Sequence, residues 1–453
     1  MTGDRAALAA AAAYVGDWLR HQRRLCDIPG YAVAIRHCGD LLLDDCDGVV
    51  RSDTGELLRP DHLFRVASHS KAFSAAAVML LRERGKLGLD DRLGHHIPDL
   101  PPAVACVTVE QLLSHGTGLP RDTYESSYWS LRRPFAATGE VAADIAKGPV
   151  QPPNTGLKYS NLGYALVGRL IEAVTGGPYI AWMNREIVAS AGLADSSADL
   201  DAEAGARLAS GHSAKLPAGK RSVLDAAVAV GPLAASAGFV SSPRDLTRFF
   251  SQLAPGAAAS FLELESRREM VRPRRADDYS DAGQHYGLGL MMGTVAEEAW
   301  FGHGGGFPGF ISKTAILPER DLAISICTNA ADGKAHAWVD GAISIVAAFA
   351  KAGAGRPAAG WEGRWWNMWG AVDLVRLGDD ILLASPDALQ PFDYCPRVRL
   401  TGPDEGTIVE ASSFHHPGET VRLERTAEWT PNRLWIAGDY WLPEAAYLSS
   451  APR

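Results

Sequence analysis

Ser68 and Lys71 are the residues whose types and spacing most directly suggest chemistry. They stand three positions apart at the start of a strongly helical stretch that continues to Leu81. Residues three apart lie on one face of a helix, with Cβ atoms about 5–6 Å apart, so the ammonium can reach the hydroxyl. A serine nucleophile needs a neighbouring base, and a lysine can be one when burial lowers its pKa. The helix N-terminus also offers unpaired N–H groups that suit an oxyanion.

The same pair has a purely structural interpretation. Ser68 could cap the helix, and Lys71 could be an exposed lysine in its first turn, an arrangement that recurs by chance. Ser70 is the weaker candidate for a nucleophile, because only Ser68 has a lysine three residues further on. The choice between cap and nucleophile therefore depends on the rest of the chain.

Two further motifs favour a site. Tyr159 and Asn161 offer a phenol and an amide immediately before a second helical stretch, although a turn with a packed tyrosine would look the same. His303 precedes three glycines, Gly304 to Gly306, in a segment that otherwise has the pattern of a strand. Glycines weaken a strand unless a ligand or another backbone must approach closely. A hydrogen-bonded core histidine is the alternative for His303.

In order and spacing, Ser-X-X-Lys, Tyr-X-Asn and His-X-Gly resemble the signature of serine β-lactamases and penicillin-binding proteins. The sequence is similar to the branch that contains class C β-lactamases, D-aminopeptidases and related esterases, in which His-X-Gly replaces Lys-Thr-Gly. The flanking segments Leu-Leu-Ser-His-Gly-Thr-Gly-Leu-Pro and Tyr-Ser-Asn-Leu-Gly-Tyr match as well. The resemblance covers roughly residues 15–350.

This resemblance implies a role for each motif residue. Ser68 would be the acylated nucleophile and Lys71 its base. Tyr159 would carry the proton between Ser68 and the leaving group, and Asn161 would orient Lys71 or the substrate amide. His303 would be an electrophilic or hydrogen-bonding partner on the strand beside the substrate.

The resemblance also implies an oxyanion hole and a set of substrate contacts. The N–H groups of Ser68 and Gly306 would bind the oxyanion, and such donors are worth about 3 kcal/mol each. The predicted substrate contacts come from the glycine strand and from an aromatic loop: Gly304, Gly305, Tyr124 and Trp129. Ordinary packing would explain the aromatic residues equally well. No metal or other cofactor is expected. A histidine in place of the lysine that engages a substrate carboxylate argues against strong β-lactam hydrolysis.

The segments around the motifs predict an α+β domain over residues 1–351. The expected elements are an opening helix, a hairpin at 30–43, the helix from Ser68 to Arg84, a helix at 162–174, strands at 300–306, 310–317 and 322–328, and a last helix at 335–351. This order is typical of an antiparallel sheet with the terminal helices on one face. The resemblance adds a helical subdomain, as in the β-lactamase and transpeptidase fold.

Leu8, Val15, Trp18 and Leu19 are expected to pack inward from the opening helix, and Gly85 is a natural C-cap for the Ser68 helix. Ser242 is expected to start a further helix, because Pro243 follows it at the first helical position and Asp245 at the third.

A second domain is predicted for residues 361–453, after a linker at 352–360 that is rich in small residues. Seven of the twelve tryptophans lie in this final stretch, among short alternating runs separated by turns. That pattern indicates a small antiparallel β-barrel. Gly363 and Trp365 near its first strand resemble the Gly-X-Trp of lipocalin-like barrels.

Composition limits the partners and the compartment. A net charge of -9 offers no basic face for nucleic acid or an anionic membrane. No apolar run approaches 18 residues, and the alanine-rich start lacks the positive region of a signal peptide. The six cysteines show no C-x-x-C pair, and Cys327 lies in an apolar run. Buried free thiols and a cytoplasmic location are therefore expected.

A hydrolase domain followed by a lipocalin-like domain is similar to penicillin-binding-protein-type thioesterases. Those enzymes release and macrocyclise nonribosomal peptides whose chain ends in a D-residue. We therefore expect acyl transfer through a Ser68 acyl-enzyme, with a peptidyl thioester, free or carrier-bound, or a D-amino-acid peptide as donor. A D-stereospecific aminopeptidase or amidase and a carboxylesterase are the enzymatic alternatives. A catalytically inactive protein whose β domain binds a lipid or apolar ligand is the alternative of another class.

Overall fold

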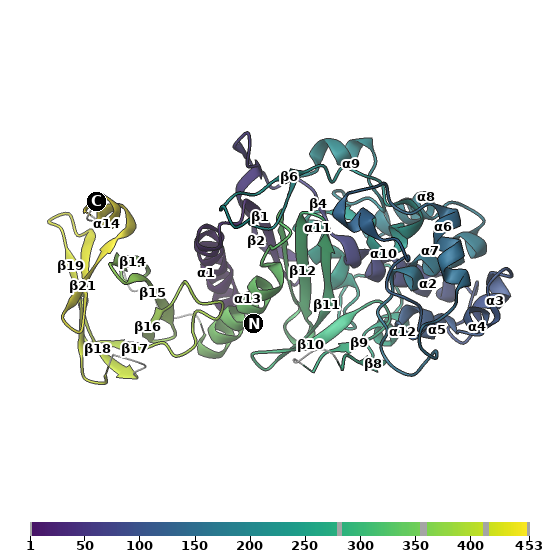
Figure 1. Ribbon diagram of the computed structural model, residues 1–453. Coiled ribbons are helices and arrows are strands. Elements are labelled where there is room, and N and C mark those ends of the chain that lie inside the picture. Colours follow the sequence, from purple (N-terminus) through teal and green to yellow (C-terminus); the bar gives the residue numbers. More distant parts are fainter. Residues whose placement is uncertain (1, 279–282, 354–359, 411–415, 451–453) are drawn as a thin grey trace. The chain divides into compact units, whose positions relative to one another are not determined.

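The computed structural model describes residues 2–278, 283–353, 360–410 and 416–450 (Figure 1). The chain divides into a larger compact unit, Asp27–Val339, and a smaller one made of Met1–Cys26 with Asp340–Arg453. The predicted domain boundary around 352–360 stays a prediction, and residues 354–359 of that linker lie outside the described residues. Within the described ranges, no helix combines the length and the apolar character needed to cross a membrane.

The larger unit is built on an antiparallel sheet, as predicted. Its nine described strands follow the order β3-β2-β1-β13-β12-β11-β10-β9-β8. Their bounds are β1 Gly30–His37, β2 Asp40–Arg51, β3 Glu56–Leu57, β8 Arg275–Ala276, β9 His285–Tyr286, β10 Met291–Val295, β11 Glu298–Phe307, β12 Phe310–Leu317 and β13 Leu322–Thr328. The hairpin β1–β2 and the strands β11, β12 and β13 were expected from the sequence. The strands β8, β9 and β10 were not, because pieces of two to five residues carry no clear period.

The centre of the sheet is buried on both faces. β13 has every residue buried, and it pairs with β1 on one side and with β12 on the other. Helix α11, Pro243–Gln252, packs across β1, β12 and β13. Its start follows the predicted signal, because the Ser242 hydroxyl accepts the Asp245 N–H and Pro243 occupies the first turn.

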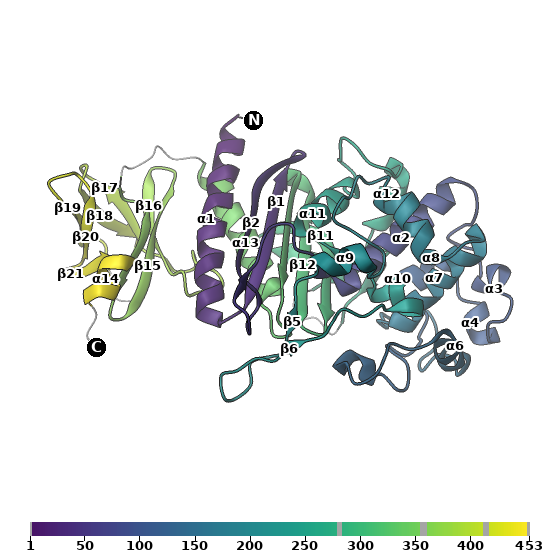
Figure 2. The ribbon, with the colours of Figure 1, turned by 90° about the horizontal axis from the view of Figure 1, so that it is seen from above.

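A helical region completes the larger unit. Helices α2, Ser70–Glu83, α7, Asn161–Thr175, and α10, Ala234–Ala237, pack against one another beside the sheet (Figure 2). The α2 residues 70–81 are all buried, as expected for a helix that is apolar all round. α2 ends before Gly85, which takes a left-handed φ of 66°, as the sequence predicted.

Shorter elements connect these parts. The helices are α3 Leu93–His96, α4 Pro102–Ala105, α5 Val109–Leu113, α6 Thr138–Ala146, α8 Tyr179–Met183, α9 Ala202–Arg207 and α12 Leu264–Met270. Single turns are η1 Ala67–His69, η2 Ser127–Ser130, η3 Asn184–Val188, η4 Gly231–Leu233 and η5 Pro318–Arg320. Two small ladders pair β4 Phe64–Arg65 with β7 Val240–Ser241, and β5 Gly211–His212 with β6 Val223–Leu224. β4 is the extended lead-in to Ser68.

The smaller unit contains the opening helix α1, Thr2–Cys26, most of α13, Ala335–Ala352, and the terminal α14, Glu444–Ser450. The side chains predicted to point inward from α1, Leu8, Val15, Trp18 and Leu19, are buried. A Cβ on Gly341 would lie 2.5 Å from the Trp18 ring. Glycine at 341 therefore lets α13 approach the indole closely.

The smaller unit also contains the predicted barrel, which is closed and eight-stranded. Its strands are β14 Gly363–Asn367, β15 Gly370–Leu377, β16 Asp380–Ala384, β17 Arg397–Leu400, β18 Glu405–Glu410, β19 Thr420–Arg425, β20 Pro431–Ile436 and β21 Asp439–Pro443. Side chains including Trp361, Trp365, Ile381 and Leu434 fill its interior. Eight strands leave an interior that side chains can fill, so the barrel has a packed core.

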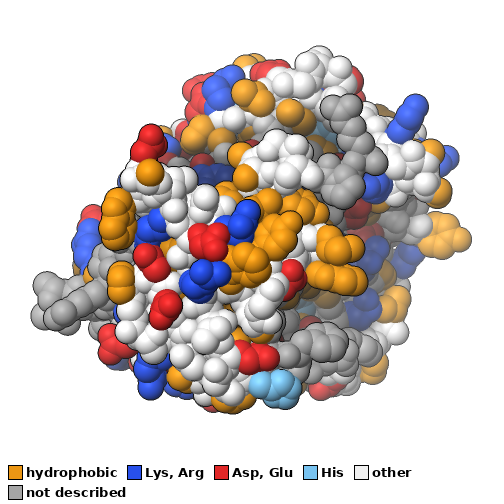
Figure 3. Space-filling view, turned by 90° about the vertical axis from the view of Figure 1, so that its left-hand side faces the viewer, with side chains coloured by type: hydrophobic (Ala, Val, Ile, Leu, Met, Phe, Trp, Pro, Cys, Tyr) orange, Lys and Arg blue, Asp and Glu red, His pale blue; other side chains and the backbone are white. Residues whose placement is uncertain are grey.

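The tryptophans of the barrel divide between its core and its surface. Trp361 and Trp365 are buried, whereas Trp369 and Trp429 are 80% and 70% exposed. Figure 3 shows a face of the molecule on which hydrophobic side chains gather among charged ones. Tryptophan content therefore predicted the barrel, but it did not separate core residues from surface residues.

The expectation that the cysteines are buried is correct only for Cys327, since three others are half-buried and two are exposed. Cys327 is buried in β13, but Cys38 and Cys106 are exposed. Cys38 belongs to the tight turn between β1 and β2, and Cys106 follows the four-residue helix α4. Both positions are at the surface because connections between elements run there.

Candidate active site

Ser68 lies in the turn η1, between the lead-in strand β4 and helix α2. Ala67 has a φ of 46°, a left-handed value that is strained for a residue with a Cβ. The resulting kink leaves Ser68 partly exposed while the next residues enter the core. The N-cap of α2 is His69, and that of η1 is Val66. The interpretation of Ser68 as a helix cap is therefore wrong.

The two residues after Ser68 have structural roles. The Ser70 hydroxyl donates to the Ala67 carbonyl at 2.6 Å and accepts the Phe239 N–H at 2.9 Å. The His69 ring bonds to the Val66 carbonyl at 2.9 Å and to the Thr314 hydroxyl at 3.0 Å. Burial lowers the pKa of His69 to about 3, so the ring is neutral. These bonds fix the turn that presents Ser68.

Lys71 is fully buried, which excludes the surface-lysine interpretation. Its Nζ donates to Ser68 Oγ at 3.1 Å, to Asn161 Oδ1 at 2.8 Å and to the Ser236 carbonyl at 2.9 Å. Burial lowers the pKa of Lys71 to about 7, against the opposing effect of the Asp122 carboxylate. A lysine with this pKa is partly neutral near pH 7, and the neutral amine can take a proton from the serine.

Tyr159 and Asn161 lie on either side of Ser160, the N-cap of helix α7. The Ser160 hydroxyl accepts the Gly163 N–H at 2.9 Å and donates to the Pro120 carbonyl at 2.6 Å. Burial raises the pKa of the Tyr159 phenol, and the neighbouring Ser68 side chain opposes this effect. Lys71 Nζ lies 4.7 Å from the centre of the Tyr159 ring. The structure thus brings Ser68, Lys71, Tyr159 and Asn161 together.

Asp122 is a member of the site that the sequence did not reveal. Its carboxylate accepts the Asn161 Nδ2–H at 2.7 Å and the Trp129 Nε1–H at 2.9 Å. Because the amide nitrogen of Asn161 faces Asp122, its oxygen faces Lys71. The sequence showed Asp122 only as an acidic residue in an aromatic loop, and no motif distinguished it from other acidic residues. Asp122 therefore orients Asn161 and attaches Trp129 to the site.

His303 lies on β11 with its ring buried. Nε2 accepts from the Tyr286 hydroxyl at 3.0 Å, and Nδ1 donates to the Gly304 carbonyl at 2.6 Å. Burial lowers the pKa of His303 well below its usual value, and the Lys71 cation adds to this effect. A neutral, hydrogen-bonded ring agrees with the core-histidine alternative. The catalytic role of His303 stays a prediction.

The three glycines after His303 differ in what a side chain would meet. A Cβ on Gly304 would be 2.4 Å from the His336 ring, and one on Gly305 would be 2.1 Å from the Val66 carbonyl oxygen. Gly306 is exposed, and its Cβ would meet nothing closer than Ile311 at 3.5 Å. The close backbone approach inferred from these glycines is therefore present at Gly305, beside the turn that carries Ser68.

Gly305→Ala is expected to destabilise the fold by about 1–3 kcal/mol, because the new methyl group overlaps a backbone oxygen that cannot rotate away. Denaturant unfolding measures this loss. Gly306→Ala is the matched control, with a stability change expected within about 0.5 kcal/mol. Equal stabilities for the two variants would contradict the packing argument.

The two aromatic residues predicted to contact substrate are placed differently. Trp129 is partly buried, and its ring packs edge-on against Phe135 and Phe307 at centroid distances of 5.2 and 5.9 Å. Tyr124 is 91% exposed, with the Lys147 ammonium 5.0 Å from its ring centre. The hydrogen bond to Asp122 therefore connects Trp129 to the site, whereas Tyr124 stands apart. Their contact with substrate stays a prediction.

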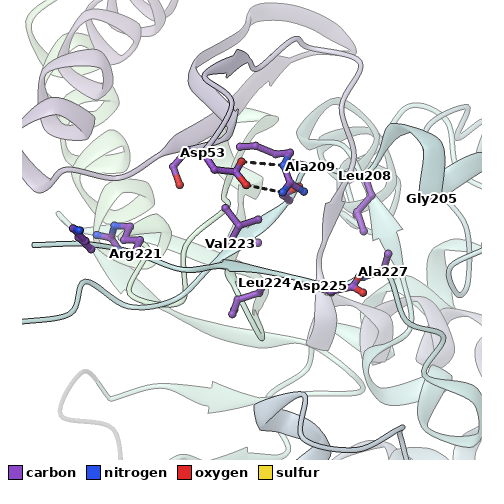
Figure 4. A pocket seen from close by; sticks show the side chains of 15 residues that line it. Asp53, Gly205, Leu208, Ala209, Arg221, Val223, Leu224, Asp225 and Ala227 are labelled. Carbon is purple, nitrogen blue, oxygen red and sulfur yellow. Dashed lines mark hydrogen bonds and ion pairs between the residues drawn. The ribbon is translucent and has the colours of Figure 1, made fainter.

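A separate pocket of about 820 Å³ lies elsewhere in the larger unit (Figure 4). Its walls come from the end of β2 and from the segment that contains β5 and β6, including Leu208, Val223 and Leu224. Arg51 and Asp53 form an ion pair of 2.8 Å on one wall. None of the residues predicted for the active site lines this pocket.

The comparisons with known proteins agree with this geometry. The family profile described as Beta-lactamase matches residues 16–347. The chain belongs to the β-lactamase family. The matched region contains every residue of the site, and it stops before the barrel.

Individual relatives of this β-lactamase-family chain cover different parts of it. Penicillin-binding protein 4 of Amycolatopsis lactamdurans is 34% identical over 156 residues, which are 33% of this chain and 39% of that protein. The crystal structure of SurE has a TM-score of 0.62 and 25% identity, and covers 97% of this chain and 100% of its own. D-amino acid amidase from Ochrobactrum anthropi SV3, complexed with D-phenylalanine, has a TM-score of 0.62 and 25% identity. That match covers 73% of this chain and 99% of the amidase.

The chain thus spans between 35% and 52% of the length of the first curated relatives that it matches. The likeness to SurE extends through the barrel, whereas the likeness to the amidase covers about three quarters of the chain. Both units therefore have counterparts in at least one solved structure.

Proposed function

We propose that this protein is a serine hydrolase or acyltransferase that forms an acyl-enzyme on Ser68. The observation that carries the proposal is Lys71, a fully buried lysine whose Nζ lies 3.1 Å from Ser68 Oγ. A buried amine with a pKa of about 7 stabilises the fold poorly, but it suits the activation of a serine. The Tyr159 phenol, which neighbours the side chain of the same serine, supplies the second proton-transfer group.

The residues divide the reaction between them. Ser68 Oγ attacks the acyl carbonyl carbon, and its proton passes to the neutral Lys71 amine or through the Tyr159 hydroxyl. The N–H groups of Ser68 and Gly306 would hold the oxyanion. When the bond to the leaving group breaks, Tyr159 gives that group a proton and regains one from the Lys71 ammonium. Water or an amine then attacks the Ser68 ester, and Ser68 recovers its proton.

We further propose a peptidyl donor that ends in a D-residue, held as a thioester that is free or bound to a carrier protein. Similarity to SurE, which was crystallised with D-Leu, and to a D-amino acid amidase supports the D-residue of this donor. Release by cyclisation and a cytoplasmic location belong to this proposal, because a carrier-bound peptide is made inside the cell. A D-amino acid amidase is the second candidate, favoured by the match to 99% of that enzyme.

The acyl-enzyme is tested by intact-protein mass spectrometry after treatment with a fluorophosphonate. The wild type is expected to gain one phosphonyl group, because the probe phosphorus accepts an activated serine oxygen and fluoride leaves. Ser68→Ala should gain none. Ser70→Ala is the matched control and should still gain one phosphonyl group, at a reduced rate, because the Ser70 hydroxyl fixes the turn but does not attack the probe. An equal adduct on Ser68→Ala would overturn the proposal.

The substrate class is tested with a pair of peptidyl thioesters that differ only in a final D- or L-residue. The thioesterase proposal predicts faster release of the D-form and some cyclic product, quantified by chromatography and mass spectrometry. Peptide amides with the same two ends are run in parallel. Turnover of the D-amide alone would identify the amidase instead. Release without stereochemical preference would remove both candidates and leave the general hydrolase.

A further inference from the structure

His115 lies in the loop after α5, in the segment Ser-His-Gly-Thr-Gly, and plays no part in the steps above. It is buried, and its φ of 60° is left-handed. Its carbonyl oxygen accepts the Lys158 N–H at 2.9 Å, and its Nδ1 accepts the Ser160 N–H at 3.2 Å. One histidine therefore holds the backbone on both sides of Tyr159.

The His115 ring also packs directly against the Tyr159 ring. The two centroids are 4.3 Å apart, with an angle of 37° between the planes. Tyr286 and Tyr164 are the next rings, with centroids 4.7 and 5.0 Å from that of His115. His115 therefore contacts the Tyr159 ring and also bonds to the backbone of the residue before Tyr159 and of the residue after it.

The hydrogen bonds also define which nitrogen of His115 carries the proton. Because Nδ1 accepts the Ser160 N–H, the proton of the neutral ring is on Nε2. Burial lowers the pKa of His115 well below its usual value, and the charged or titratable groups that act on this ring lower it further: Lys71, His303, Arg275 and Lys158. A protonated ring would turn a donor toward the Ser160 N–H and break the bond.

Nε2 of His115 is buried, and no described residue accepts a hydrogen bond from it. A buried polar group without a partner lowers the stability of the fold, so few are retained without a reason. An apolar ring would avoid that cost, but it would lose the acceptor for the Ser160 N–H. A histidine at this position therefore lowers local stability through its unpartnered Nε2 but keeps the bond to Ser160 that places Tyr159.

We propose that His115 is a positioning residue that sets the place of the Tyr159 phenol through one side-chain bond, one main-chain bond and one ring contact. This inference rests on the proposed function, in which Tyr159 transfers protons to and from Ser68. His115 touches neither Ser68 nor Lys71 by a hydrogen bond that the structure records, so it acts through Tyr159. Because misplacement of a reacting group by about 1 Å can lower a rate about a hundredfold, the effect on turnover is large.

Two substitutions separate the contributions of His115. His115→Phe keeps a ring against Tyr159 but removes the acceptor for the Ser160 N–H. His115→Asn restores an acceptor at the same distance from the backbone and tolerates the left-handed φ, but it lacks the ring. With the peptidyl thioester that ends in a D-residue as substrate, we expect kcat to fall about 10–100-fold in His115→Phe with little change in KM. In His115→Asn we expect kcat to recover in part. His95→Phe, on an exposed histidine of α3, is the matched control and should match the wild type.

A second readout does not depend on turnover. Carbon-13 at the phenol carbon of tyrosine gives an NMR signal for Tyr159, identified by its loss in Tyr159→Phe. We expect this signal to shift or broaden in His115→Phe and to return toward the wild-type position in His115→Asn. Melting temperatures show that each variant is folded.

The two readouts distinguish failure of the inference from failure of the proposed function. A wild type that forms no fluorophosphonate adduct would overturn the proposed function, and the Tyr159 signal would still decide whether His115 positions the phenol. An unchanged Tyr159 signal in folded His115→Phe would overturn the inference. The inference would also be overturned if His115→Phe and His115→Asn lost kcat equally and neither variant changed the Tyr159 signal.

Discussion

Replacing Lys71 with methionine is expected to slow acylation of Ser68 by about 10²–10⁴-fold, the usual contribution of a positioned base. Methionine retains much of the buried volume of Lys71 but has no amine to take the serine proton. The rate of fluorophosphonate adduct formation measures the effect. Lys86→Met, on an exposed lysine just beyond α2, is the matched control and should keep the wild-type rate. A loss smaller than about tenfold in Lys71→Met would mean that another group takes the proton.

The pH dependence gives the same prediction an independent check. In the proposed mechanism the base is the neutral Lys71 amine, and burial lowers the pKa of Lys71 to about 7. As the pH falls below 7, the amine is protonated, and the wild-type acylation rate should drop about tenfold per unit. Above pH 7 the rate should level off. The pH profile of Lys71→Met should lack this fall in rate below pH 7. The same fall in both proteins would mean that a group other than Lys71 is being protonated.

Arg65→Met is expected to destabilise the fold by about 3–5 kcal/mol, the range for breaking a buried ion pair. Arg65 is fully buried, and its Nη1 lies 3.5 Å from the carboxylate of Asp199, which is nearly as buried. The guanidinium also donates to the carbonyls of Ala226, Val228 and Gly238. Its removal would leave the Asp199 carboxylate without a cation and these three carbonyls without the Arg65 donors.

Denaturant unfolding of Arg65→Met, Asp199→Asn and the double variant measures the coupling between the two side chains. The double variant should lose less stability than the sum of the single variants, because no uncompensated charge remains buried. Backbone N–H groups of Val230 and Gly231 still hold the oxygens at position 199. Arg84→Met breaks the exposed pair with Glu186 and should change stability by less than about 1 kcal/mol. A similarly small change in Arg65→Met would contradict the prediction.

Arg65 also connects stability to the site. It belongs to β4, the strand that leads to Ser68, and its guanidinium carbon lies 4.7 Å from the centre of the Phe307 ring. Phe307 follows Gly306 on β11 and contacts Trp129. The variant should therefore disturb the backbone around Ser68 as well as the fold.

Local signals in the sequence predicted most elements that position the site. The N-cap of α11 at Ser242 and the end of α2 before Gly85 lie where the capping residues placed them. Burial alternates as predicted in β18 and β19, because this signal depends on residues within a few positions of one another, whereas every residue of β16 is buried. Order and spacing of the motifs likewise predicted that Ser68, Lys71, Tyr159 and Asn161 meet.

Only the tertiary structure decided how these residues work together. Asp122 is 39 positions from Asn161, and His115 is 45 positions from Ser160, so neither contact leaves a periodic or spacing signal. The burial of Lys71, and hence its pKa, depends on packing among α2, α7 and α10. Thus the sequence by itself indicated which groups we propose to carry the chemistry, through the order and spacing of the motifs. The tertiary structure determined their protonation and orientation, because these depend on distant neighbours and on the exclusion of water.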